Sequence, residues 1–138
     1  MLNKAEGAPW RAKSASGGKK ILIIEDNADS REIFRTVLEI AGYDVTEAVD
    51  GEDALQKIEE SGYSVILVDL SLPKISGWDL IEIIKKKYPL TPLIAATAHA
   101  MSGDRDKALK AGCDDYISKP LKPSDLVKKV NKYAVNEK

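Results

Sequence analysis

Cysteine, histidine and long apolar runs are scarce in this sequence, and each shortage excludes a class of protein. Cys113 and His99 are the only residues of their types in the 138 positions, which excludes an internal disulfide and a paired-cysteine zinc or redox motif. The longest apolar runs, such as residues 21–24 and 65–68, are far shorter than the roughly 18 residues that cross a bilayer. We therefore expect no membrane span, and a cytoplasmic protein.

The charges are almost balanced in number but unevenly placed. The formal net charge is -1, yet residues 1–20 hold five basic residues against one acidic residue, and residues 21–138 hold 16 against 21. The first stretch is also poor in apolar side chains, so burial cannot offset the entropy of ordering it. We predict a flexible basic tail over residues 1–19 and a single domain over residues 20–138, whose acidic balance argues against a nucleic-acid surface.

Short apolar runs alternate with amphipathic stretches from residue 20 onward, and the alternation repeats five times. Apolar residues recur at helical spacing in the amphipathic stretches, and Gly42 and Gly112 follow two of these as helix ends. This pattern is typical of parallel strands joined by helices that cover both faces of the sheet. We predict an α/β fold of three layers. The expected strands are residues 21–25, 44–48, 65–70, 93–96 and 115–118.

Polar side chains stand at the predicted ends of four of these strands. Parallel strands joined by right-handed crossovers place their carboxyl ends at one edge of the sheet, where ligands bind. We therefore expect the strand-end side chains to converge on one site. They are Glu25 and Asp26 after the first strand, Asp69 at the end of the third, Thr97 after the fourth and Lys119 after the fifth.

Three carboxylates gathered at one edge repel one another, so either one of them is protonated or a cation binds. All the available ligands are oxygens, which selects a hard ion, and a site with few carboxylates suits Mg²⁺ better than Ca²⁺. A metal that faces a lysine and a threonine makes a pocket suited to a phosphoryl group. Asp69 lies between these groups and is the candidate nucleophile, whose attack on phosphorus would form an acyl phosphate.

With these motifs the sequence resembles the receiver domain of two-component response regulators over roughly residues 20–135. The resemblance implies a flavodoxin-like (βα)5 fold whose parallel sheet has the strand order 2-1-3-4-5. Family members often have aspartate at the position of Glu25, which is the one departure that matters. The motifs that carry the resemblance are Glu25-Asp26, Asp69-Leu70-Ser71-Leu72-Pro73 with Gly77 after it, Thr97-Ala98, and Lys119-Pro120.

The resemblance also implies a role for each site residue. Asp69 would accept a phosphoryl group from a histidine kinase or a histidine phosphotransfer protein, and Thr97 and Lys119 would hold the phosphoryl oxygens. Thr97 and Tyr116 would form a switch that repacks the face of the fourth helix, fifth strand and fifth helix, which a downstream protein effector would contact. Mg²⁺ would be bound by Glu25, Asp26, Asp69 and the backbone carbonyl of Ser71.

Other functions fit parts of the pattern. A phosphatase of the haloacid dehalogenase type also uses a strand-end aspartate with Mg²⁺, but it needs a second aspartate where Ser71 stands. A flavodoxin-like cofactor binder needs hydroxyls and amides after its first strand, where Glu25 and Asp26 would repel a phosphate. A receiver that serves only as a scaffold would not need an intact phosphoacceptor set. We predict a signalling module rather than an enzyme, either stand-alone or the C-terminal receiver of a hybrid histidine kinase.

Some site residues also fit plainer roles. An acidic pair after a strand can simply begin a helix beside a capping residue such as Asn27. Tyr116 can be a strand aromatic that packs on the core, since only the resemblance gives it a switching role. The basic tail is either a contact for an acidic partner or a linker.

Overall fold

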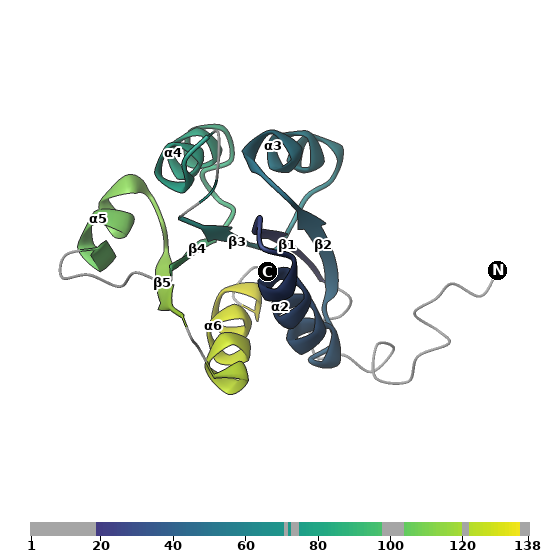
Figure 1. Ribbon diagram of the computed structural model, residues 1–138. Coiled ribbons are helices and arrows are strands. Elements are labelled where there is room, and N and C mark those ends of the chain that lie inside the picture. The colour runs from purple at the N-terminus through teal and green to yellow at the C-terminus, as the bar shows by residue number, and fades with distance from the viewer. Residues whose placement is uncertain (1–18, 71, 73–74, 98–103, 120–121, 136–138) are drawn as a thin grey trace.

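Strands and helices alternate along the whole described chain (Figure 1). The computed structural model describes residues 19–70, 72, 75–97, 104–119 and 122–135. The strands are β1 (Lys20–Ile24), β2 (Asp44–Ala48), β3 (Val65–Asp69), β4 (Leu93–Thr97) and β5 (Asp115–Ser118). The helices are α2 (Ala28–Ile40), α3 (Gly51–Glu60), α4 (Gly77–Lys87), α5 (Asp104–Ala111) and α6 (Pro123–Val135). Each predicted strand is confirmed to within one residue at either end.

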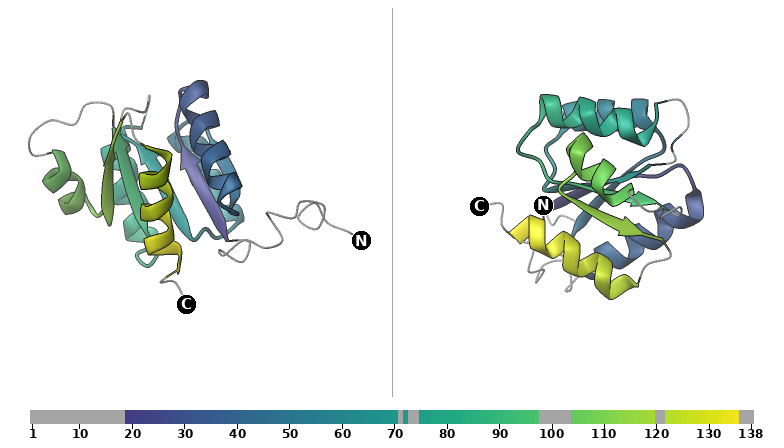
Figure 2. Two further views of the ribbon diagram at one scale, coloured as in Figure 1. Left: turned by 90° about the horizontal axis from the view of Figure 1, so that it is seen from below. Right: turned by 90° about the vertical axis from the view of Figure 1, so that its left-hand side faces the viewer.

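The five strands form one parallel sheet in the order β2-β1-β3-β4-β5, which is the order expected from the resemblance. Helices α2 and α6 cover one face of the sheet, and α3, α4 and α5 cover the other (Figure 1 and Figure 2). The predicted three-layer α/β architecture is therefore confirmed. Among the described residues, no helix combines the length and apolar character needed to cross a membrane.

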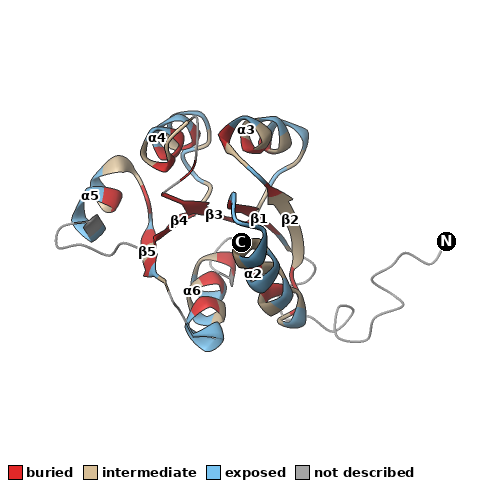
Figure 3. Cartoon of the chain, in the orientation of Figure 1, coloured by how far each residue is buried: buried red, intermediate tan, exposed pale blue. Residues whose placement is uncertain are grey.

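Each face of the sheet has its own hydrophobic core, because successive side chains of a strand point to opposite faces. In β1, Leu22 and Ile24 pack beneath α3 and α4, whereas Ile21 and Ile23 pack against α2 and α6. All four are fully buried (Figure 3), and burying a side chain of this size stabilises a fold by about 1.5–3 kcal/mol. The two cores hold the sheet rigid at the edge where the strand-end residues lie.

Helix α5 contributes least to these cores. Among its described side chains only Ala108 is buried, whereas the neighbouring α4 buries Leu80, Ile81 and Ile84. A cation–π contact links the two helices, with the Nζ atom of Lys107 lying 4.7 Å from the centroid of the Trp78 ring. Because burial of apolar surface is the main stabilising contribution, α5 is the helix that the sheet holds least strongly.

Local sequence signals set where the helices begin and end. Asn27, Asp50 and Ser76 precede α2, α3 and α4, and each side chain accepts a hydrogen bond from the backbone N–H three residues on, at 2.8, 2.8 and 3.2 Å. A cap of this kind stabilises a helix by about 1 kcal/mol. Gly42 and Gly112 follow α2 and α5 with φ angles of 102° and 123°, a conformation that favours glycine.

A buried carboxylate ties β5 to α6. Asp115 accepts hydrogen bonds from its neighbour Tyr116 N at 2.8 Å, Lys129 Nζ at 3.0 Å and Tyr133 Oη at 3.0 Å. Burial alone would raise the pKa of Asp115, but these donors outweigh it and hold the pKa below 3.8. The group therefore stabilises the fold above that pH and loses this contribution as the pH falls through the lowered pKa.

We expect Asp115→Asn to lower the free energy of unfolding at pH 7 by about 1.5 kcal/mol, the usual worth of a hydrogen bond to a charged group. The difference from the wild type should begin to narrow below pH 3.8, the ordinary pKa of an aspartate, and should vanish below the lowered pKa of the folded state. Urea unfolding at pH 7 and pH 3 measures both values. Asp106→Asn, at an exposed position on α5, is the control and should match the wild type at both pH values. An equal loss from Asp115→Asn at the two pH values would contradict this account.

Candidate functional site

The carboxyl edge of the sheet brings the predicted strand-end residues together. Asp69 is the last residue of the central strand β3 and pairs in register with Ala96, so Thr97 at the end of β4 lies one residue beyond it. Asp69 and Thr97 are both buried, with 5% and 3% of their surface exposed. Lys119 follows β5 directly, and its backbone N–H donates to the carbonyl of Thr97 at 2.8 Å. The arrangement expected from the strand ends is the one observed.

The three acidic residues form one cluster. One carboxylate oxygen from each of Glu25, Asp26 and Asp69 lies within 4.8 Å of the other two. Glu25 and Asp69 are buried and Asp26 is exposed, so solvent reaches the cluster at Asp26. An all-oxygen donor set at this spacing fits a hard divalent cation that keeps several waters, and Mg²⁺ is the ion that best meets this description.

Glu25 is the most deeply buried member of the cluster. Its Oε1 atom lies 2.6 Å from Lys119 Nζ, and its Oε2 atom accepts a hydrogen bond from Asn27 N at 3.2 Å. Burial raises the pKa of Glu25 to about 7, helped by the neighbouring Asp69 and opposed by Lys119. A cation bound at the cluster would favour the charged form of Glu25 and so oppose this rise in pKa.

Lys119 forms a nearly buried ion pair with Glu25 in this structure. The side chains of the two residues are only 17% and 2% exposed. Lys119 Nζ also lies 5.6 Å from the centroid of the Phe34 ring on α2. The resemblance predicted a lysine that faces a phosphoryl group, but not one already paired with the first acidic residue. Its ammonium group has three donors, so it can reach a second acceptor at this edge without leaving Glu25.

Gly77 lies directly against the end of β3, the strand that ends at Asp69. A Cβ atom built on Gly77 would lie 2.5 Å from the carbonyl oxygen of Asp69 and 2.5 Å from the Cα of Leu70. The first turn of α4 can approach β3 this closely only because residue 77 has no side chain. The sequence marked Gly77 as part of a motif but did not reveal this contact.

Other predicted residues fall at various distances from the cluster. Tyr116 is half-buried on β5 and packs against the core beneath α4 and α5, which is compatible with both of its predicted roles. Ser71, whose carbonyl was predicted to bind the metal, lies outside the described residues, and so does His99. Arg31 and Glu47 were not predicted at all, although Arg31 contacts the backbone of the acidic pair at Glu25 and Asp26. On α2 and β2 their charges had no signal that set them apart from ordinary surface residues.

Fold and site together define an α/β domain with an acidic cluster and a lysine at the carboxyl edge of a parallel sheet. The model of the family "Response regulator receiver domain" matches residues 21–131. The chain therefore belongs to the receiver domain family of response regulators, as its motifs had indicated.

Curated relatives place the domain in several settings. The polar-differentiation response regulator DivK of Brucella ovis is 34% identical over 117 residues, which cover 83% of this chain and 95% of DivK. Hybrid signal transduction histidine kinase I of Dictyostelium discoideum is 38% identical over 122 residues, which cover 82% of this chain but only 7% of the kinase. The probable transcriptional regulator ycf27 of Porphyridium aerugineum is 40% identical over 108 residues, covering 78% of this chain and 45% of ycf27. The chain thus spans less than half of two of these relatives.

Solved structures share the whole domain. The receiver domain of Francisella response regulator 1452 superposes with a TM-score of 0.82 at 32% identity, covering 87% of this chain and 99% of that one. The receiver domain of sensor histidine kinase PA1611 from Pseudomonas aeruginosa PAO1 has a TM-score of 0.80 at 34% identity, covering 86% and 99%. The latter structure has a magnesium ion coordinated in its active site cleft.

Proposed function

We propose that this receiver domain accepts a phosphoryl group on Asp69, in the presence of Mg²⁺, from the phosphohistidine of a histidine kinase or a histidine phosphotransfer protein. The observation that carries the proposal is the cluster of Glu25, Asp26 and Asp69 with Lys119 at the carboxyl edge of the sheet. The magnesium ion in the PA1611 receiver supports the choice of metal. Glu25, Asp26 and Asp69 would hold the ion, with the carbonyl of Ser71 as the further ligand expected from the motif.

In the transfer step, a carboxylate oxygen of Asp69 attacks phosphorus while the bond from phosphorus to the donor's imidazole nitrogen breaks. The imidazole keeps the electron pair of that bond and takes up a proton from water, and Asp69 becomes an acyl phosphate. Bound Mg²⁺ supplies charge neutralisation for the phosphoryl oxygens. Lys119 and Thr97 hold those oxygens in place, Lys119 as a cation and Thr97 as a hydroxyl donor. Water later hydrolyses the acyl phosphate, and the module turns over no other substrate.

The proposal is tested by incubating the protein with acetyl phosphate and Mg²⁺ and measuring its intact mass. We expect one added phosphate that survives acid and is lost in base, as an acyl phosphate should be. Removal of Mg²⁺ with EDTA should abolish the addition, and Asp69→Asn should acquire none. No adduct on the wild type, or an equal adduct on Asp69→Asn, would overturn the proposal. Sustained hydrolysis of a phosphate monoester such as p-nitrophenyl phosphate, which is not an acyl phosphate, would instead indicate a phosphatase.

We further propose that the signal leaves through the face formed by α5, β5 and α6, which corresponds to the fourth helix, fifth strand and fifth helix of the domain. Tyr116 lies on β5 beside the weakly held α5, so its rotation would change this face first. Thr97, on the neighbouring strand, would move toward the new phosphoryl group and leave the space that Tyr116 enters. The register that places Ala95 opposite Tyr116 and Thr97 opposite Ser118 supports this coupling between β4 and β5.

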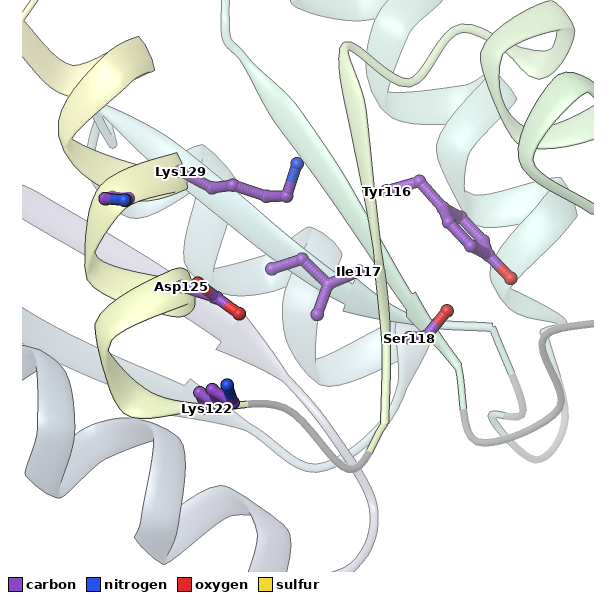
Figure 4. A pocket seen from close by; sticks show the side chains of 7 residues that line it. Tyr116, Ile117, Ser118, Lys122, Asp125 and Lys129 are labelled. Carbon is purple, nitrogen blue, oxygen red and sulfur yellow. The ribbon is translucent and has the colours of Figure 1, made fainter.

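A groove of about 500 Å³ lies between β5 and α6, and the lysines that line it give this face a positive charge. Lys122 and Lys128 line it, both are exposed, and neither has an ion-pair partner within the described part of the chain. Asp125 is the one acidic residue in the lining (Figure 4). Lys129 is paired with Asp115, with Nζ and Oδ1 3.0 Å apart. On a domain with an excess of acidic residues, such a groove favours an acidic segment of the downstream partner.

We expect a double charge reversal, Lys122→Glu with Lys128→Glu, to abolish binding of a fluorescein-labelled glutamate-rich peptide, measured by fluorescence anisotropy at low salt. Lys20→Glu with Lys86→Glu reverses two exposed lysines outside this face, changes the net charge by the same amount, and should bind like the wild type. Phosphorylation by acetyl phosphate should be unchanged in all three proteins, which separates the groove from the phosphoacceptor site. Equal loss of binding in the control would show that the peptide senses total charge only.

A further inference from the structure

Arg31, on the first turns of α2, holds the backbone that carries the acidic pair. Its Nη1 atom donates to the carbonyl oxygen of Glu25 at 3.1 Å and to that of Asp26 at 3.2 Å. Its Nε atom donates to Glu47 Oε1 at 2.9 Å, and the side chain is 18% exposed. One guanidinium group therefore joins the edge strand β2, the helix α2 and the three-residue connection between β1 and α2.

Glu47 also pairs with a second arginine, Arg35, which can be compared with Arg31. Its Oε2 atom lies 2.6 Å from Nε of Arg35, which is one helical turn beyond Arg31. The two side chains form an ion pair, but the N–H group of Arg35 is not aligned for a hydrogen bond. Arg35 Nη1 also lies 3.9 Å from Glu39 Oε1, and within the described part of the chain Arg35 makes no hydrogen bond or ion pair with the acidic pair. Both arginines anchor α2 to β2, but only Arg31 reaches the connection that bears Glu25 and Asp26.

The hydrogen bonds in this connection leave its backbone little freedom. Glu25 N donates to the carbonyl of Ala48 at 3.0 Å, and Asn27 N donates to the carboxylate of Glu25 at 3.2 Å. The carbonyls of Glu25 and Asp26 accept from Arg31, so the peptide planes on either side of Asp26 are both held. Because Asp26 is exposed, its carboxylate has little packing of its own to direct it, and its backbone must do so.

We propose that Arg31 is a positioning residue for the metal site: it fixes the peptide planes of the acidic pair so that both carboxylates face Asp69. This inference rests on the proposed function, since it concerns the same Mg²⁺ site. Outer-shell partners of this kind commonly change metal affinity by roughly 10–100-fold when removed.

The positive charge of Arg31 should weaken Mg²⁺ binding, whereas its hydrogen bonds to the backbone should strengthen it. The two effects can therefore be told apart by experiment. A guanidinium near the site repels a divalent cation, even though Glu47 offsets part of that charge. Loss of the charge alone would therefore tighten Mg²⁺ binding. Loss of the backbone contacts would weaken it, and the proposal requires that this second effect dominates.

The experiment is a calorimetric titration of Mg²⁺ into the full chain, comparing Arg31→Gln with Arg35→Gln. We expect the Mg²⁺ dissociation constant to rise about 10-fold in Arg31→Gln and to change by less than twofold in Arg35→Gln. Both variants lose a contact with Glu47, and Arg31→Gln also loses two hydrogen bonds to the backbone of the acidic pair, so its melting temperature, measured by circular dichroism, should fall further. Arg31→Lys keeps the charge but cannot reach Glu47 and both carbonyls at once, so it should also weaken Mg²⁺ binding. This second variant keeps the proposal testable if Arg31→Gln does not fold.

The phosphorylation kinetics provide a second readout. With acetyl phosphate, the Mg²⁺ concentration that gives half the maximal rate should rise in Arg31→Gln, while the maximal rate at saturating Mg²⁺ returns to within twofold of the wild type. Tighter or unchanged Mg²⁺ binding in Arg31→Gln, or equal weakening in Arg35→Gln, would overturn the role of Arg31. Failure of the wild type to become phosphorylated would overturn the proposed function instead, and the calorimetric comparison would still decide the role of Arg31.

Discussion

Replacement of Gly77 by alanine is expected to destabilise the domain strongly. The new Cβ would lie 2.5 Å from the Asp69 carbonyl oxygen and from the Leu70 Cα, both of which are backbone atoms that no side-chain rotation can move away. Either the first turn of α4 or the end of β3 must shift. Overpacking of this kind costs about 3 kcal/mol, measurable as a lowered urea midpoint.

Gly62→Ala is the matched control, because a Cβ at Gly62 would meet nothing within 4 Å. Its free energy of unfolding should stay within about 0.5 kcal/mol of the wild type. If Gly77→Ala folds, the displacement of Asp69 should also slow its phosphorylation by acetyl phosphate. Identical urea midpoints for the two alanine variants would show that α4 and β3 can separate at little cost, contrary to this account.

Replacement of Lys119 by methionine should slow phosphorylation of Asp69 by at least about 100-fold, the usual effect of removing a group that stabilises developing charge. The variant would lose the cation that we propose holds the phosphoryl oxygens. It also leaves Glu25, whose side chain is 2% exposed, without its ion-pair partner. The rate of mass addition with acetyl phosphate at saturating Mg²⁺ measures the effect.

Lys122→Met controls for the loss of a nearby positive charge. Lys122 lies three residues further along the chain, is exposed and lines the groove on β5 and α6. Its methionine variant should be phosphorylated at the wild-type rate. If Lys119→Met kept a rate within twofold of the wild type, its ion pair with Glu25 would be purely structural.

The sequence predicted the fold well because its signals are local. Each strand is a short apolar run bounded by polar residues, and β1 and β3 are buried along nearly their whole length. The convergence of Glu25, Asp26 and Asp69 was also predictable, since parallel strands must place their ends at one edge. The strand order, in contrast, came only from the resemblance to a known family.

Contacts between distant segments were not predictable in the same way. The pairing of Lys119 with Glu25 joins residues 94 positions apart, and the approach of Gly77 to Leu70 depends on how α4 packs on β3. The contacts of Arg31 were not predictable either, because a cation on an amphipathic helix is usually solvated. Only the structure shows that two backbone carbonyls accept hydrogen bonds from Arg31. The sequence indicated the residues expected to carry out the chemistry of the site, and the structure adds the contacts that hold those residues in place.

The shallow packing of α5 affects how much free energy a phosphoryl group must supply. Ala108 is its only buried described side chain, so this helix can shift while the core between the sheet and α2 and α6 stays intact. Local rearrangements of this kind require far less free energy than global unfolding. In the proposed mechanism, one new charge at Asp69 would therefore alter the outer surface of the domain without endangering its fold, because the signal would travel through the segment that contributes least to stability.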